Sequence, residues 1–187
     1  MKKGCKVTLY IVIAIAVLGI IFAIVYHNVI KNKGNEVAWI KSGNHQVGKE
    51  LSAGEYVLIA TGKKPNYEII KDKIEVAKDS IDNQAYITIE KGQTVKLVDA
   101  KMCKINEAPI FKSDDGVYKQ GMYKVGRDVV AGDYKLKSEG SGYYAILSDT
   151  KGCISSVLEN SSFSGEKTVS IKSGQYIKIL DATMKAK

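Results

Sequence analysis

The sequence predicts a mainly β fold, in which one N-terminal transmembrane helix precedes two tandem β-sandwich or jelly-roll-like repeats. Three observations support this prediction: an uncharged apolar run near the N-terminus, an internal repeat over most of the remaining chain, and a period-two alternation of apolar and polar residues inside each repeat. Period-two alternation marks strands with one buried face. Many short strands between Gly, Asn, Asp and Ser turns are typical of sandwich folds.

The first element is the apolar run at residues 7–26, which reads VTLYIVIAIAVLGIIFAIVY and contains no charge. At about 1.5 Å per helical residue, such a run covers about 30 Å, the thickness of the hydrocarbon core of a bilayer. We therefore predict a transmembrane helix at 7–30, flanked by a tail at 1–6 and a juxtamembrane linker at 31–39. The alternative is a cleaved signal peptide, although the run is longer than the usual apolar region of about 7–15 residues.

Basic residues at the two ends of this run predict its orientation. Lys2, Lys3 and Lys6 precede the run, whereas Lys31 and Lys33 follow it. Basic flanks favour the cytoplasmic side, and a short basic tail is the usual form of a signal-anchor. We expect a single-pass protein of the cell membrane with a cytoplasmic N-terminus and an extracytoplasmic C-terminal domain.

Two matched sequence blocks reveal the internal repeat. GNHQVGKELSAGEY at 43–56 shares six identical positions with GMYKVGRDVVAGDY at 121–134, at an offset of 78 residues. ITIEKGQTVKLVDAKM at 87–102 matches VSIKSGQYIKILDATM at 169–184, at an offset of 82. Because the blocks recur in the same order, we infer a tandem duplication in which the second copy carries about four extra residues in its middle.

The duplication sets the predicted domains: β repeat 1 at 40–103, a linker at 104–117 and β repeat 2 at 118–187. Gly92-Gln93 and Gly174-Gln175 are predicted to be hairpin connections, because a glycine suits a positive φ in such a turn. The flanking segments and four further apolar stretches are predicted strands: 55–61, 67–77, 133–138 and 142–148.

Two segments of each repeat resemble an uncharacterised repeat of Gram-positive surface proteins that are anchored by a membrane helix or a lipid. The first segment reads V-G-[KR]-[DE]-x-x-A-G-[DE]-Y, and the second is the later strand–Gly-Gln–strand segment. The resemblance covers residues 40–184. The usual form has Ile-Pro where this chain has Leu51-Ser52 and Val129-Val130. The resemblance implies an extracytoplasmic β-sandwich and no known chemistry.

The composition argues against nucleic-acid binding and against common forms of catalysis. The net charge is +8, yet the lysines are scattered and Arg127 is the only arginine, whereas phosphate recognition favours several. Of the two histidines, His27 lies at the exit of the predicted membrane helix and His45 corresponds to Tyr123 of the second repeat, where a planar side chain and not an imidazole is repeated. Without a catalytic histidine, a Ser or Cys triad lacks its base. We predict no enzyme, no catalytic residue, no cofactor and no metal site, with a hydrolase that uses an unrecognised carboxylate pair as an alternative.

The acids that recur in both repeats, Glu50/Asp128 and Glu55/Asp133, flank a Gly turn and are predicted to stabilise it. Cys103 and Cys153 would both face the outside, which leaves a single disulfide open.

Tyrosine is the best sign of binding, since the chain has eleven. Exposed tyrosines on a sheet can stack on sugars or form protein contacts; the alternative is that they cap half-buried strand faces. The candidate binding face comprises Tyr56, Tyr134, Tyr143, Tyr144 and Tyr176.

From these observations we predict a membrane-anchored extracytoplasmic β-repeat protein that acts as a non-catalytic binding or interaction module at the cell surface. Its expected partners are the lipid bilayer, through residues 7–30, and a cell-wall polymer or another surface protein. A structural accessory subunit of a membrane complex is the alternative.

Overall fold

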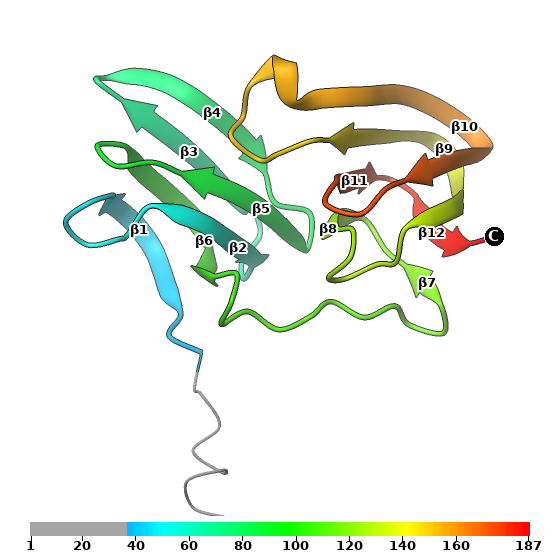
Figure 1. Ribbon diagram of the computed structural model, residues 1–187, viewed down its shortest axis with the longest axis horizontal. Helices are drawn as coiled ribbons and strands as arrows, with labels where there is room; N and C mark the ends of the chain where they lie inside the picture. The colour runs from blue at the N-terminus through cyan, green and yellow to red at the C-terminus, as the bar shows by residue number, and fades with distance from the viewer. Residues whose placement is uncertain (1–36) are drawn as a thin grey trace, which may run out of the picture. The chain divides into compact units, whose positions relative to one another are not determined.

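Antiparallel β-sheet makes up nearly all regular structure in residues 37–187, the part of the chain that this computed structural model describes (Figure 1). The predicted mainly β fold is therefore confirmed for these residues. Within them, no helix is long and apolar enough to cross a membrane. The span predicted at 7–30 and the tail at 1–6 lie outside the described residues.

Repeat 1 is one six-stranded antiparallel sheet with the strand order β4-β3-β6-β2-β5, in which β1 also pairs with β6. Its strands are β1 (Ile40–Gln46), β2 (Gly54–Ala60), β3 (Asn66–Lys71), β4 (Ile74–Ser80), β5 (Gln84–Ile89) and β6 (Thr94–Lys104). The first half of β6 pairs with β3 and its second half pairs with β2. The strand bends between these halves at Asp99, which has a φ of 48°. Because one bent strand belongs to both sides, the sheet curls around its own core.

Repeat 2 has the same pairing in a second six-stranded sheet, of order β7-β12-β9-β11-β8 with β10 beside β9. Its strands are β7 (Val117–Tyr118), β8 (Gly121–Lys124), β9 (Gly132–Leu147), β10 (Val157–Ile171), β11 (Tyr176–Leu180) and β12 (Thr183–Ala186). The register is also duplicated: Tyr56 pairs with Ile87 in repeat 1, and Tyr134 pairs with Val169 in repeat 2. Asp181, with a φ of 49°, occupies the bend that Asp99 occupies in repeat 1.

Three of the predicted strands were wrong in their boundaries. The predicted strands 133–138 and 142–148 form one continuous strand, β9, because the segment between them lacks the proline that interrupts repeat 1 at Pro65. The predicted strand 67–77 is instead the hairpin β3–β4. Its two-residue turn, Asp72-Lys73, has positive φ at both positions (51° and 67°), a conformation typical of tight hairpins that the sequence did not signal with a glycine.

The Gly-Gln segments do not form the hairpins that the sequence predicted. β5 pairs with β2 and not with β6, so residues 90–93 cross from one side of the curled sheet to the other. The Gln93 side chain accepts a hydrogen bond from the Glu90 N–H at 2.7 Å, and its backbone carbonyl accepts one from the Val47 N–H at 2.9 Å. Gln175 repeats both contacts, with the N–H groups of Lys172 at 2.7 Å and Val125 at 2.8 Å. The recurring Gly-Gln and Val-Gly pairs therefore hold one another in place.

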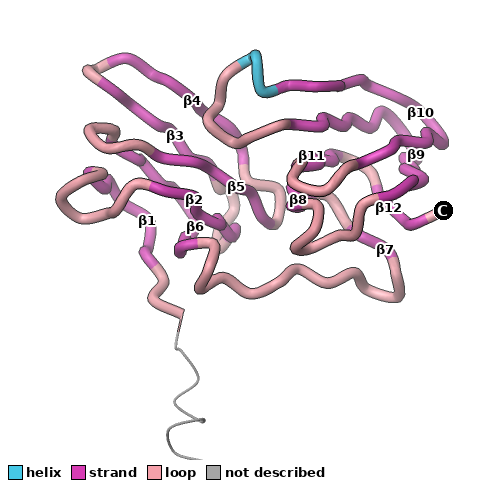
Figure 2. The backbone as a smooth tube through the Cα atoms, viewed as in Figure 1, coloured by secondary structure: helices cyan, strands magenta, loops and turns pink. Residues whose placement is uncertain are grey.

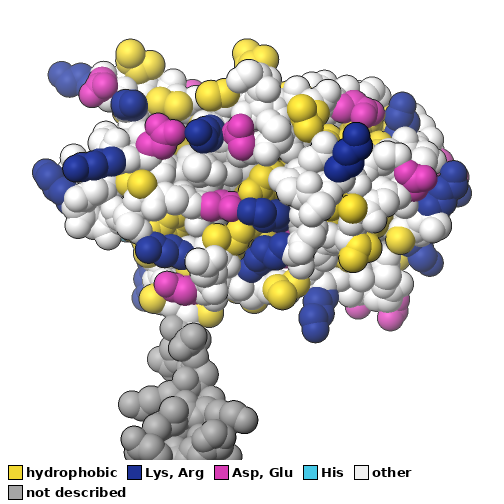
Figure 3. All heavy atoms as spheres, in the orientation of Figure 1, with side chains coloured by type: hydrophobic (Ala, Val, Ile, Leu, Met, Phe, Trp, Pro, Cys, Tyr) yellow, Lys and Arg dark blue, Asp and Glu magenta, His cyan; other side chains and the backbone are white. Residues whose placement is uncertain are grey.

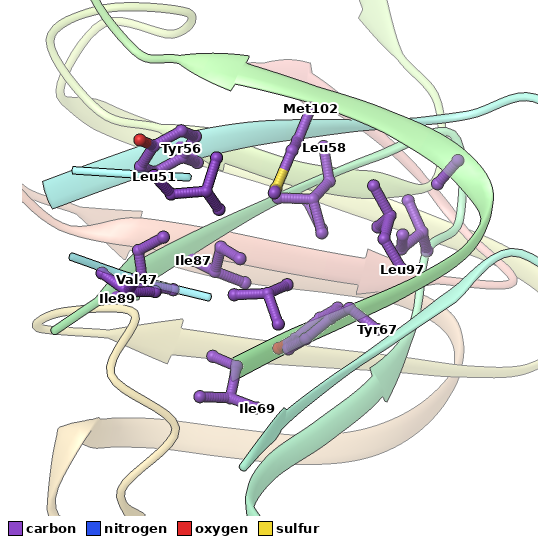
Figure 4. Close-up of a cluster of buried hydrophobic side chains, with 14 residues drawn as sticks. Val47, Leu51, Tyr56, Leu58, Tyr67, Ile69, Ile87, Ile89, Leu97 and Met102 are labelled. Carbon is purple, nitrogen blue, oxygen red and sulfur yellow. The ribbon is translucent and has the colours of Figure 1, made fainter. Parts of the chain in front are cut away.

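Each repeat encloses a hydrophobic core of its own. Figure 4 shows the core of repeat 1, where Leu58 and Ile87 have no exposed surface; full burial of such a side chain contributes about 1.5–3 kcal/mol. Tyr56 and Tyr134, which the sequence analysis assigned to a candidate binding face, are 1% and 2% exposed. Their hydroxyls donate to the carbonyls of the residues four positions earlier, Ser52 and Val130, both at 2.9 Å. Each tyrosine thus fixes the turn before its strand, as a tyrosine corner does.

Candidate functional site

The two repeats pack against each other through outward-facing side chains of their sheets. A third buried cluster combines Val57 and Tyr86 of repeat 1 with Met122 and Tyr176 of repeat 2. The Tyr86 and Tyr176 rings lie 5.5 Å apart between centroids, a distance typical of favourable aromatic pairs. Because this surface is apolar and excludes water, the repeats form one unit.

A buried polar network surrounds this cluster and centres on Asp128, whose side chain is fully enclosed. One carboxylate oxygen accepts from the Tyr86 hydroxyl and from the Lys124 N–H at 2.9 Å. The other accepts from Arg127 Nη1 at 2.7 Å and from the Phe111 N–H at 3.2 Å. The only arginine of the chain therefore serves the interface between the repeats and is not free to bind an anion.

The recurring acids have different roles from one another. Asp128 bonds to the backbone of its own turn at Lys124, which confirms the predicted turn-stabilising role for this residue. Glu55, in contrast, reaches repeat 2, where it accepts from the Tyr176 hydroxyl and pairs with Lys124 Nζ at 2.6 Å. Asp133 accepts from the Ser170 hydroxyl on the neighbouring strand. The turn role predicted for Glu55 and Asp133 is thus not observed.

The positions of the interface residues carry different residue types in the two repeats, depending on whether the other repeat covers them. Val57 and Tyr86 correspond to Lys135 and Thr168 in repeat 2, and both of these are exposed. Met122 of the interface corresponds to the exposed Asn44 of repeat 1. At these three positions, the apolar residue occurs in the copy where the position is covered by the other copy, and a polar residue occurs where it is exposed.

The extra residues of repeat 2 form a loop at residues 148–156 that packs on repeat 1. Figure 2 shows this loop, with its single helical turn at η1 (Ile154–Ser156), between β9 and β10. The Thr88 N–H donates to the Thr150 carbonyl at 3.0 Å, and the two threonine hydroxyls lie 2.9 Å apart. Gly152 lies so close to β4 that a Cβ at this position would be 2.3 Å from the Cβ of Ala77. The loop therefore covers part of the edge strand of repeat 1.

Below this loop, the two repeats enclose a cleft of about 270 Å³. Its apolar lining includes Ala77 on β4 and Ala145 and Leu147 on β9. Lys178 of repeat 2 and Asp79 of repeat 1 also line it and form an ion pair across the repeat boundary. The Lys178 side chain is only 14% exposed, so this pair lies at a partly dehydrated site.

Asp149 is the second carboxylate of the cleft. Its pKa is held below its usual range by the hydrogen bond from the Lys151 N–H at 3.0 Å and then by the Ser156 hydroxyl at 2.7 Å. A carboxylate with a lowered pKa is a poor proton donor at neutral pH. None of the residues that line the cleft is a histidine. The arrangement places oriented donors and acceptors beside apolar walls, so it can bind and orient a molecule.

The five tyrosines of the predicted binding face are not brought together on an exposed surface. Tyr56, Tyr134 and Tyr144 are core residues with 1–2% exposure, and Tyr176 lies in the interface between the repeats with 5% exposure. Only Tyr143 is half-buried with its ring on the cleft. The other four tyrosines instead pack against the faces of strands, which was the alternative to a binding role.

Tyr67, like the ion pair of Lys178 and Asp79, is part of the cleft that sequence reasoning missed. It is 7% exposed, belongs to the core of repeat 1 and lines the cleft. Burial, and then the neighbouring Asp79 carboxylate, raise the pKa of its hydroxyl above the usual range, so the hydroxyl stays protonated. Its counterpart Tyr144 was in the predicted set, and the strand pairing that relates the two could have identified it.

The cysteines do not form the disulfide that the sequence left open. Both are free: Cys103 is buried in repeat 1, and Cys153 is exposed on the loop at the cleft. Burial raises the pKa of the Cys103 thiol to about 11. Among the described residues, no group of three or more His, Cys, Asp or Glu side chains is placed to hold a metal ion.

Figure 3 shows lysine and acidic side chains interspersed over the visible face of residues 37–187, with no large patch of one sign. This face therefore offers no concentrated positive charge to a polyanion. A comparison with protein-family models finds no match to this chain. A search of curated protein sequences finds no significant relative.

Proposed function

We propose that the chain is a single-pass membrane protein whose residues 37–187 form an extracytoplasmic, non-catalytic binding module at the cell surface. In this proposal the cleft between the repeats receives the ligand. The observation that carries it is the loop at 148–156, which repeat 2 has in place of the two-residue turn Asp72-Lys73 of repeat 1. The duplicated copies differ in length mainly at the point where the longer loop encloses a cleft.

The chemistry of the cleft supports binding over catalysis. Asp79 is neutralised by Lys178, and Asp149 is held ionised by donors of its own loop. Neither carboxylate is placed to exchange a proton with a substrate, which hydrolysis by a carboxylate pair requires. Apolar walls with a few oriented polar groups are typical of a small-ligand site.

The predicted membrane anchor supports an extracytoplasmic location of the β domain. The uncharged run at 7–26 and the basic tail before it favour an N-terminal signal-anchor with the β domain outside. The cysteines provide the test, because Cys153 is exposed and Cys103 is buried. In a Cys5→Ser variant, a membrane-impermeant maleimide should label Cys153 on intact cells. Labelling that occurs only after lysis would contradict the extracytoplasmic location.

The same cysteine tests the cleft. We expect the full-length protein, purified in detergent, to bind cell-envelope material from its own organism. Attachment of a bulky polyethylene-glycol maleimide to Cys153 should abolish that binding by blocking the cleft. The matched control is a Cys153→Ser variant exposed to the same reagent, which should bind normally. Equal binding by the labelled and unlabelled proteins would refute a role for the cleft.

A further inference from the structure

Corresponding tyrosines of the two repeats differ in what their hydroxyls contact. In repeat 2, the Tyr144 hydroxyl donates to the Glu159 carboxylate on β10. Glu159 pairs with Ile146 in the sheet, and the equivalent pair in repeat 1 is Ala77 with Ile69. Repeat 1 therefore has a methyl group at the position where repeat 2 has the carboxylate that satisfies its tyrosine.

The loss of this partner leaves the Tyr67 hydroxyl available to the cleft. No side-chain or backbone group in residues 37–187 forms a hydrogen bond with it. Every fully enclosed side-chain oxygen or nitrogen of these residues has a partner, so the Tyr67 hydroxyl must reach open space, and the cleft is the space that Tyr67 lines. Because this hydroxyl opens only to the cleft, a ligand or a water in the cleft completes its hydrogen bonding.

The charges of the ionic groups around this hydroxyl sum to zero. Two lysines, Lys78 and Lys178, and two aspartates, Asp79 and Asp149, line the cleft. An ionic ligand would gain no net attraction and would disturb the pair between Lys178 and Asp79. A neutral ligand with several hydroxyls can accept hydrogen bonds from the lysines and from Tyr67 and donate them to the carboxylates.

The walls and the volume restrict the ligand further. Leu147, Ala145 and the ring of Tyr143 offer an apolar surface opposite the polar groups. The C–H face of a pyranose ring is apolar, whereas its rim carries hydroxyls, so it presents both kinds of surface at once. A cleft of about 270 Å³ has room for one sugar ring.

We propose that the cleft binds a single uncharged pyranose unit of a surface glycan, and that the hydroxyl of Tyr67, the ammonium of Lys178 and the carboxylate of Asp79 form its polar subsite. This inference rests on the proposed function of the cleft and adds the ligand class. Tyr67 is in this view a specificity-determining residue, because Ala77 stands where repeat 2 has Glu159 and leaves the Tyr67 hydroxyl without a carboxylate partner.

The test uses the full-length protein in a detergent without sugar head groups, because a glycosidic detergent would compete. The probes are glucose, galactose and N-acetylglucosamine, with glucose 6-phosphate and glucosamine as charged counterparts, measured by saturation-transfer NMR and titration. At least one uncharged sugar should bind more tightly than its charged counterparts. Tyr67→Phe removes only the hydroxyl and should raise the Kd about three- to tenfold, the loss of one hydrogen bond.

Tyr144→Phe is the matched control, since it removes the equivalent hydroxyl from repeat 2 and should leave the Kd unchanged. Absence of binding by all three uncharged sugars would overturn the inference, as would tighter binding of a charged counterpart or a Kd that Tyr67→Phe does not change. If these results occurred while the Cys153 adduct still blocked envelope binding, the cleft would be a binding site for another ligand class. If the adduct had no effect, the proposed function itself would fail.

Discussion

Replacement of Asp128 by Asn should weaken the joint between the repeats more than any comparable surface change. The enclosed carboxylate accepts four hydrogen bonds, two at each oxygen, and it is the counter-ion of Arg127. An amide keeps one oxygen, but its NH2 group then faces either the Lys124 N–H beside the Tyr86 hydroxyl, which can turn to accept, or the donors of Arg127 and the Phe111 N–H. At least one hydrogen bond and the charge compensation of Arg127 are lost together.

The expected magnitude follows from these losses. Hydrogen bonds to charged groups contribute about 1.5–3 kcal/mol each and do not add fully, and breaking a buried ion pair costs about 3–5 kcal/mol. We therefore expect the free energy of unfolding to fall by about 3 kcal/mol. For a domain of this size, about 2–4 °C is lost per kcal/mol, so the Tm should fall by about 6–12 °C.

The assay is thermal and urea unfolding of residues 37–187, followed by far-UV circular dichroism. The wild-type fragment should unfold in one cooperative step because the two repeats share a buried cluster. Glu50→Gln is the matched control at the duplicated position in repeat 1, where the side chain is 59% exposed and lies 3.4 Å from the Gln46 N–H. Its effect should stay within about 0.5 kcal/mol. Equal effects of the two substitutions, or two separate transitions in the wild type, would refute this account of the joint.

Two further predictions concern the covering loop and the buried thiol. Gly152→Ala should destabilise the fold by about 1–3 kcal/mol, because the new Cβ would lie 2.3 Å from that of Ala77 and the φ of Gly152 is 82°. The control Gly165→Ala, where φ is 73° and no atom lies near the new Cβ, should cost only the backbone strain of about 1 kcal/mol. Urea unfolding that ranks the two variants in the opposite order would contradict the packing of the loop. At pH 8, Cys103 should resist a thiol reagent that modifies Cys153 rapidly, because Cys103 is buried and the pKa of its thiol is about 11. Mass spectrometry should show modification of Cys103 only in denaturant. Fast modification of Cys103 in buffer would show that the core of repeat 1 opens.

The sequence by itself determined the duplication, the strand-rich character and the positions of several turns. These properties are local or periodic: Val95 and Leu97 alternate with Lys96, and the Gly-Gln and Val-Gly pairs recur at fixed offsets. Because duplicated segments fold in the same way, the matched blocks predicted the equivalence of Tyr56 and Tyr134, which the structure repeats down to the hydrogen bond at 2.9 Å. The predicted membrane helix is a local property as well, but residues 7–30 lie outside the described part of the chain.

The site, in contrast, was decided by the tertiary structure. Tyrosine is amphipathic, so its sequence position does not say whether its ring is buried in a core, buried in an interface or available to a ligand; only the packing of the sheets separates Tyr144 from Tyr143. Similarly, Val57 and Lys135 occupy one position of the repeat, and the choice of the covered face depends on how the two copies pack. The cleft itself arises because nine residues at 148–156 fold over a neighbouring repeat, a contact between segments far apart in sequence that no local pattern encodes.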